Sequence, residues 1–164
     1  MLDALAPFLA WDLSAWEVYG LFFLLGSFVV ATLSDVKHLS AQREFMDVWW
    51  AFAVLMLAIQ LYAADWRPEL PFYLKWGLVL VGALLSHRTL GLWLRLATAD
   101  VAAIVAAASL FPPLLVVAFF VLLKLLAWPA ARLLARGRPA YPFMPVVTVA
   151  TLLLIALALF SGGL

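Results

Sequence analysis

The sequence predicts an all-α integral membrane protein, a bundle of about six transmembrane helices forming a single domain over residues 1–164. Hydrophobic residues make up 68% of the chain and charged residues only 12%, which leaves too little polar surface to cover a water-soluble domain. Aromatic residues account for 15%, and many stand at the ends of apolar runs, where such rings anchor helices at a membrane surface. Most of the surface is therefore expected to face lipid.

Charged residues, prolines and glycines divide the sequence into six apolar runs. The runs are Trp16–Leu33, Val48–Ala64, Phe72–Leu85, Leu96–Phe111, Leu114–Trp128 and Val146–Phe160. Several are shorter than the roughly 20 residues that cross about 30 Å of hydrocarbon, so the helices should extend into their flanks. Only Pro112 and Pro113 separate the fourth run from the fifth. A proline pair removes two backbone donors, so we predict a tight hairpin there rather than one kinked helix.

Basic residues are concentrated in the loops after the first, third and fifth runs. These loops carry Lys37, Arg43, Arg88, Arg95, Arg132, Arg136 and Arg138. The opposite side has little more than Arg67 and Lys75, beside Asp65 and Glu69. Because cytoplasmic loops carry an excess of Lys and Arg, we predict that the basic loops are cytoplasmic and that both termini lie outside.

The residue inventory restricts the chemistry. The chain has no cysteine, which removes disulfides, thiolate nucleophiles and cysteine-ligated zinc. Two histidines, His38 and His87, are too few for a histidine-based metal cluster. We expect no cofactor, no metal and no nucleic-acid partner, with any chemistry confined to the bundle and its short cytoplasmic loops.

Two of the nine acidic residues, Asp35 and Asp100, lie where an apolar helix meets a basic loop. An ionisable group at this depth costs a few kcal/mol, so it usually faces the bundle interior or a water-filled cavity. Small residues recur around Asp100 at three- and four-residue spacing, at Ala99, Ala103, Ala106 and Ala107. They let neighbouring helices approach closely and favour an inward-facing Asp100.

Two helices separate Asp35 from Asp100, so both return to the same side of the membrane and can meet. Two carboxyl groups in a poorly solvated site share a proton. One can then activate water while the other protonates the carbonyl oxygen or the leaving amine, as in aspartic proteases. The alternative is structural, with each aspartate capping a helix or pairing with Lys37 or Arg95.

Three segments, Ser34–Leu39, Ala99–Ala103 and Tyr141–Pro145, together resemble the type IV prepilin peptidases and archaeal preflagellin peptidases. These are membrane aspartyl proteases of the Gly-x-Gly-Asp class, with six helices. Their first aspartate ends helix one, their second begins helix four, and a proline-containing motif precedes the last helix. Here both motif glycines are replaced by alanine, at positions 97 and 99, and the Ile-Pro-Asn element expected after the first aspartate is absent.

The resemblance implies that Asp35 and Asp100 are the catalytic pair of a membrane-embedded aspartyl endopeptidase. It would lie in the cytoplasmic membrane of a prokaryote, with its active site facing the cytoplasm. Its substrates would be precursors with class III signal peptides, type IV pilin-like or archaellin-like proteins, from which it removes the short basic leader. Bacterial relatives often add a methylating activity associated with a cysteine-bearing insertion, which this chain lacks, so we expect peptidase activity only.

Further residues are candidates for substrate binding. Glu44 and Asp47 could attract the basic leader, although acids at a helix start also complement the helix dipole. Pro142 and Pro145 could shape a substrate groove, although prolines also initiate helices. Trp49 is expected, with its neighbour Trp50, to anchor the chain at the membrane surface.

Two other kinds of protein compete with the peptidase interpretation. A presenilin-like intramembrane protease would share the pair of aspartates but normally has more helices and a Pro-Ala-Leu motif. A small proton-coupled carrier or a non-catalytic membrane scaffold would use the acids as relay or pairing groups. A carrier should show polar groups in mid-membrane and an inverted repeat, and the sequence shows neither plainly.

Overall fold

The computed structural model describes residues 8, 11, 13–38, 43–134 and 141–160, which form six helices and no strand. The helices are α2 (Ala15–His38), α3 (Arg43–Ala63), α4 (Leu70–Ser86), α5 (Thr98–Ala108), α6 (Pro113–Leu134) and α7 (Met144–Phe160). The prediction of an all-α fold with six helices is therefore confirmed.

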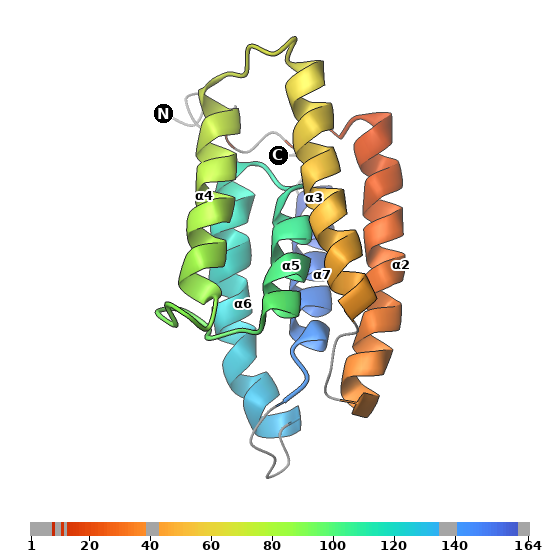
Figure 1. The fold of residues 1–164 in the computed structure, drawn as a ribbon, viewed down its shortest axis with the longest axis vertical. Helices are drawn as coiled ribbons and strands as arrows, with labels where there is room; N and C mark the ends of the chain where they lie inside the picture. The colour runs from red at the N-terminus through yellow and green to blue at the C-terminus, as the bar shows by residue number, and fades with distance from the viewer. Residues whose placement is uncertain (1–7, 9–10, 12, 39–42, 135–140, 161–164) are drawn as a thin grey trace.

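Prolines stand at the first or second position of three helices: Pro71 in α4, Pro113 in α6 and Pro145 in α7. Proline suits these positions because its missing N–H has no partner within the helix and its φ is already helical. Since α5 ends at Ala108 and α6 begins at Pro113, the chain turns at the proline pair, as predicted. A fourth proline, Pro129, lies inside α6, whose lower part bends in Figure 1.

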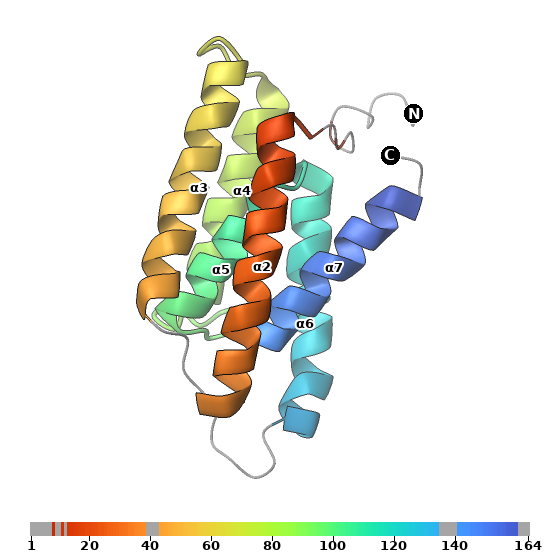
Figure 2. The same ribbon diagram turned by 90° about the vertical axis from the view of Figure 1, so that its right-hand side faces the viewer.

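Successive helices run in alternating directions (Figures 1 and 2). The lower end, as drawn in Figure 1, is where α2, α4 and α6 finish and α3, α5 and α7 begin; the upper end is the opposite one. By length and composition α2, α3 and α6 can each cross a membrane, and α4, α5 and α7 are shorter apolar helices. With 11 residues, α5 is about 16 Å long, roughly half the hydrocarbon thickness.

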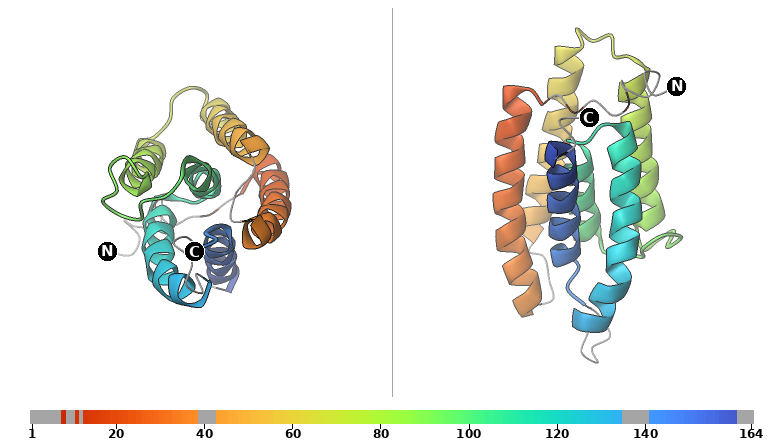
Figure 3. Two further views of the ribbon diagram at one scale, coloured as in Figure 1. Left: turned by 60° about the horizontal axis from the view of Figure 1, so that its bottom comes forward. Right: turned by 180° about the vertical axis from the view of Figure 1, so that it is seen from behind.

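The short helix α5 occupies the centre of the bundle (Figure 3). It contacts α2, α3, α4 and α7, and every residue from Val101 to Ala108 is buried. Five of its alanines have no exposed surface: Ala102, Ala103, Ala106, Ala107 and Ala108. Small side chains let four neighbours approach one helix closely. Asp100 itself, which was predicted to face inward, is partly exposed at the start of the helix.

Gly82 permits the close packing of α4 on α6. A Cβ added there would lie 2.3 Å from the Phe120 ring, so Gly82→Ala is expected to lower the free energy of unfolding by about 1–3 kcal/mol through overpacking. Gly77, in the same helix, has no atom within 4 Å of such a Cβ. Gly77→Ala should be neutral, or stabilising by up to about 1 kcal/mol. Unfolding midpoints in detergent compare the two, and equal effects would contradict the packing argument.

Trp49 is not a surface anchor. Its side chain has no exposed surface, its indole N–H donates to Ser27 Oγ (3.0 Å), and its ring packs edge-on against Phe28, with centroids 5.6 Å apart. The prediction was wrong because the first turns of α3 pack against α2 instead of facing lipid on all sides. The neighbouring Trp50 is 38% exposed.

Candidate functional site

Asp35 lies in the last turn of α2 and is only 5% exposed. Its Oδ2 accepts a hydrogen bond from the backbone N–H of Met144, the first residue of α7, at 2.9 Å. The first N–H groups of a helix have no partner within the helix and carry partial positive charge, so they bind a carboxylate well. One turn higher, the hydroxyls of Thr32 and Thr148 hydrogen-bond at 2.8 Å. The position of Asp35 is thus fixed by α7.

Asp100 is the third residue of α5 and is partly exposed. Ala97 precedes the helix in an extended conformation, and Asp100 is the acidic residue of the first turn. An acidic side chain there lies beside backbone N–H groups that have no partner within the helix and carry partial positive charge. The helix start therefore holds the Asp100 side chain at the lower end of the bundle.

The connection between α4 and α5 fixes the start of α5. The backbone N–H of Leu96 donates to the Ser86 carbonyl oxygen (2.8 Å), and that of Arg88 donates to the Leu96 carbonyl oxygen (3.0 Å). The Trp93 indole N–H donates to the Phe120 carbonyl oxygen (3.3 Å). These bonds attach the connection to α4 and α6, so the first turn of α5 has a defined place.

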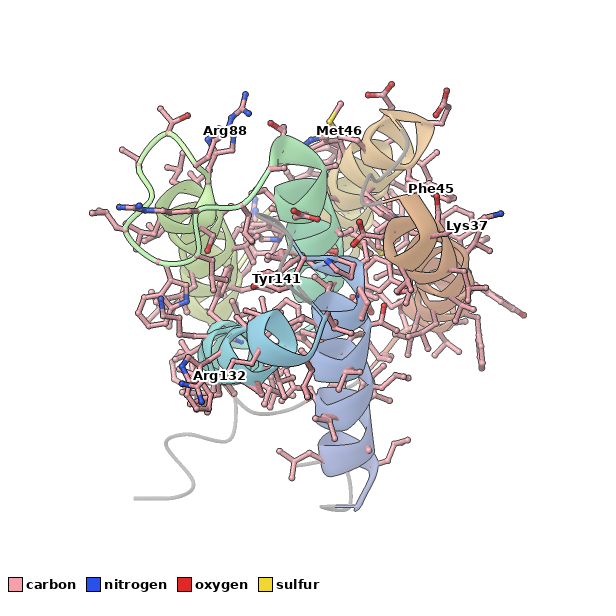
Figure 4. All side chains as sticks on the ribbon, turned by 90° about the horizontal axis from the view of Figure 1, so that it is seen from below. Lys37, Phe45, Met46, Arg88, Arg132 and Tyr141 are labelled. Carbon is pink, nitrogen blue, oxygen red and sulfur yellow. The ribbon has the colours of Figure 1, made fainter. Side chains whose placement is uncertain are left out.

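The structure brings Asp35 and Asp100 to the same end of the bundle. Helices α2 and α5 are in contact, and Asp35 lies in the last turn of α2 while Asp100 lies in the first turn of α5. The basic residues considered as partners are directed elsewhere: Arg95 donates to the Gly91 carbonyl oxygen (3.2 Å), and Lys37 lies at the periphery of this end (Figure 4). The two aspartates thus share one end of the bundle, each beside the N-terminus of a helix.

Tyr141 is a polar residue of this site that the sequence did not single out. Its side chain lies near the middle of the lower end (Figure 4) and packs against Phe143, with centroids 6.1 Å apart. Burial, and to a smaller extent the charge of Asp100, raises the pKa of the Tyr141 phenol. The phenol is therefore protonated at neutral pH and can donate a hydrogen bond. Its place in the segment Tyr141–Pro145 was the available sequence signal.

The predicted substrate-binding residues fall into two groups. Glu44 and Asp47 are exposed in the first turns of α3, at the end where Figure 4 shows Phe45 and Met46. Pro142 is buried just before α7. Pro145 lies in the first turn of α7 and lines an apolar cavity of about 250 Å³ between α6 and α7, so it both begins a helix and shapes a groove.

The two positions where the resembled motif has glycine do not need glycine here. Ala97 has φ −70° and ψ 159°, which is ordinary extended backbone, and Ala99 is helical. Any L-residue adopts these conformations without strain. Alanine at both positions is therefore compatible with the observed start of α5.

No group of three or more potential metal ligands occurs within the described ranges. Comparisons with family models, curated proteins and solved structures gave no match. The site combines Asp35, Asp100 and Tyr141 at one end of an apolar helical bundle.

Proposed function

We propose that the protein is a membrane-embedded aspartyl endopeptidase that removes the short basic leader from type IV pilin-like or archaellin-like precursors. The observation that carries the proposal is the location of Asp35 and Asp100, two aspartates that lie at one end of the bundle on separate apolar helices in contact with each other. Such a pair hydrolyses a peptide bond without a metal or a covalent intermediate.

In this proposal all six helices lie in the cytoplasmic membrane of a prokaryote, with the lower end facing the cytoplasm and both termini outside. The basic residues support this orientation, because Lys37, Arg88 and Arg132 all lie at the lower end (Figure 4) and cytoplasmic ends are enriched in Lys and Arg. The active site would then face the cytoplasm, the side of the membrane on which the precursors and their leaders are synthesised.

The reaction requires one proton shared between the two aspartates. We assign the general base to Asp35, because its Oδ2 already accepts the Met144 N–H as a carboxylate oxygen does. Asp35 removes a proton from water while the water oxygen attacks the peptide carbonyl carbon, and Asp100 protonates the carbonyl oxygen. Proton transfer to the amide nitrogen then breaks the C–N bond and releases leader and mature protein.

Substrate binding would use the charges and the groove at the lower end. The exposed Glu44 and Asp47 place negative charge where a basic leader approaches, which favours encounter. The apolar groove beside Pro145, with Leu126 and Val149 among its walls, could accept an apolar side chain of the precursor. The scissile bond would then lie extended beside Asp35 and Asp100.

The competing proposal, a non-catalytic scaffold, also has support. Asp35 binds the N-terminus of α7, and Asp100 lies in the first turn of α5, where its charge complements the helix dipole, so each carboxylate could stabilise the bundle without taking part in a reaction. The two proposals differ in what asparagine should do. If the protein is a scaffold, asparagine at these positions should lower only its stability. If the protein is a peptidase, asparagine should abolish cleavage.

Co-expression with a precursor that carries a basic class III leader tests the proposal. Wild-type protein should shorten the precursor by the length of the leader, whereas the double variant Asp35→Asn/Asp100→Asn should leave it intact. Equal shortening by the two proteins, both present in the membrane fraction, would rule out the aspartate mechanism.

Tyr141 is expected to donate a hydrogen bond to the carbonyl oxygen as negative charge develops on it. Loss of one such donor typically costs about 10²-fold in kcat, so Tyr141→Phe should lower kcat to that extent with little change in KM. Because burial raises the pKa of the phenol above its ordinary value, the phenol stays protonated across the neutral pH range. The variant should therefore keep the wild-type pH profile at lower pH. An unchanged kcat would exclude Tyr141 from the reaction.

A further inference from the structure

A second polar cluster lies at the upper end, away from the aspartates. It is formed by Glu17 from α2, Gln60 from α3 and Lys75 from α4. The proposed peptidase reaction uses none of these residues. Their helices begin or end at the upper end of the bundle (Figure 1).

Gln60 is the hub of this cluster. Its Nε2 donates to Glu17 Oε1 (2.8 Å) and to the Ser109 carbonyl oxygen (3.1 Å). Its Oε1 accepts from Lys75 Nζ (3.1 Å) and from the Trp76 indole N–H (3.2 Å). A side-chain amide has two donors and two acceptor positions, so the bonding capacity of Gln60 is filled.

Lys75 is only 8% exposed, and among the described residues its ammonium has one hydrogen-bond partner. Of its three N–H donors, one reaches Gln60; the Trp76 ring, 5.7 Å from Nζ, provides a further cation–π contact. The other two donors have no hydrogen-bond acceptor among the residues that the structure describes. Leaving buried donors unpaired is unfavourable, so this ammonium is suited to bind an external acceptor.

Glu17 has complementary free capacity. Its Oε2 accepts from Ser14 N (3.0 Å) and Ser14 Oγ (2.8 Å), and its Oε1 accepts from Gln60. A carboxylate offers about four acceptor positions, so one remains for a cationic donor. The cluster thus offers two unfilled binding positions on neighbouring helices. The Lys75 ammonium can bind an anion, and the Glu17 carboxylate can bind a cation.

Both charged groups line one cavity of about 210 Å³. It lies beyond the end of α5 at Ala108, beside the connection that leads to α6. Trp11 and Phe72 are among its aromatic walls, and Leu110 and Pro112 belong to the connection from α5 to α6. Four other cavities in the described part of the chain have almost wholly apolar walls.

We propose that this cavity binds the headgroup of an ethanolamine phospholipid, with its phosphate on Lys75 and its amine on Glu17. The charges of Lys75 and Glu17 cancel, so a simple anion would place an uncompensated negative charge beside Glu17. A zwitterionic aminophosphate fills both open sites and keeps the cavity neutral. Neutrality matters because buried charge is costly unless it is paired.

The position of the cavity favours a membrane lipid as the source of this headgroup. Lys75 is five residues from the first residue of α4, about 8 Å along the helix axis. The headgroup layer on each side of a bilayer is of similar depth, about 5–8 Å. Aromatic side chains such as Trp11 and Phe72 are typical of this layer. The site therefore lies where a headgroup is present at high local concentration.

Lipid binding to the purified full-length chain in detergent tests the proposal by native mass spectrometry and thermal unfolding. Phosphatidylethanolamine should bind at least tenfold more tightly than phosphatidylcholine, whose trimethylammonium group has no N–H to donate. Phosphatidylethanolamine should also bind more tightly than phosphatidylglycerol, whose headgroup carries no cationic group. Free phosphoethanolamine, the soluble arm, should bind more weakly than the lipid; tighter binding of the soluble compound would overturn the lipid assignment.

Two variants assign the contacts. Lys75→Met removes the phosphate partner, and Glu17→Gln keeps an acceptor for Gln60 while removing the charge that pairs with the amine. Each should reduce phosphatidylethanolamine binding at least tenfold, and Lys124→Met, at the lower end, should not. Undiminished binding by a folded Glu17→Gln variant, or equal binding of the three lipids by wild type, would overturn the proposal. Because no cleavage is measured, the outcome is independent of the peptidase proposal.

Discussion

Asp35→Asn or Asp100→Asn is expected to reduce the rate of leader removal by about 10²–10⁴-fold, the usual contribution of a general acid or base. Asparagine has almost the same shape as aspartate but can neither accept the proton from water nor donate one as a carboxylic acid. In the Asp35→Asn variant the side-chain carbonyl oxygen can still accept the Met144 N–H, so α7 should remain in place. Initial rates with purified protein and a precursor measure the loss, and circular dichroism measures retention of the fold.

Glu44→Gln and Asp47→Asn are the matched controls, because these acids lie at the same end but are exposed and in the first turns of α3. Their loss should raise KM severalfold through weaker attraction of the basic leader and should leave kcat near the wild-type value. If the controls lost kcat as severely as the aspartate variants, the chemistry could not be assigned to Asp35 and Asp100.

Gln60→Leu is expected to produce the largest loss of stability of any substitution considered. The change removes the hydrogen bond of the buried Lys75 ammonium and leaves the Trp76 indole N–H and the Ser109 carbonyl oxygen without this partner. Leaving a buried donor or acceptor without its partner typically costs about 1–3 kcal/mol, and more when the group is charged, as Lys75 is. Equilibrium unfolding in mixed detergent measures the difference from wild type.

The double variant Gln60→Leu/Lys75→Met separates the buried charge from loss of packing. In Gln60→Leu the buried Lys75 ammonium has lost its hydrogen-bond partner. Lys75→Met removes that ammonium, so the double variant should be more stable than Gln60→Leu alone. A double variant less stable than the single one would show that Lys75 stabilises the bundle without Gln60. A Gln60→Leu protein as stable as wild type would contradict the network.

Helix order could be predicted from the sequence because apolar runs and prolines directly determine where helices form and break. The boundaries depended on contacts that the sequence does not display. Helix α2 extends from Ala15 to His38, beyond the run Trp16–Leu33, as expected for a helix that draws in its flanks. Helix α5 is shorter than its run, since Leu96 pairs with Ser86 before the helix starts.

The common location of Asp35 and Asp100 could be predicted because it needs only an even number of crossings between them. Their neighbours at the site could not be predicted, because Met144 and Tyr141 reach it only through the packing of α7 against α2.

The upper cluster was not predicted at all. The sequence predicts only that Lys75 lies on the non-cytoplasmic side of the membrane. It gives no sign that the Lys75 side chain is buried, as it is in α4. Sequence spacing alone does not relate it to Glu17 and Gln60, which lie on two other helices. Only the packing of α2, α3 and α4 brings the three side chains together.

The intact mass of a precursor after incubation with the purified protein in liposomes shows directly whether Asp35 and Asp100 cleave it. Wild-type protein should give one product, shortened at the end of its basic leader. Asp35→Asn and Asp100→Asn should each leave the precursor uncleaved. The same shortened product from either asparagine variant, at the wild-type rate, would rule out the two aspartates as the catalytic pair.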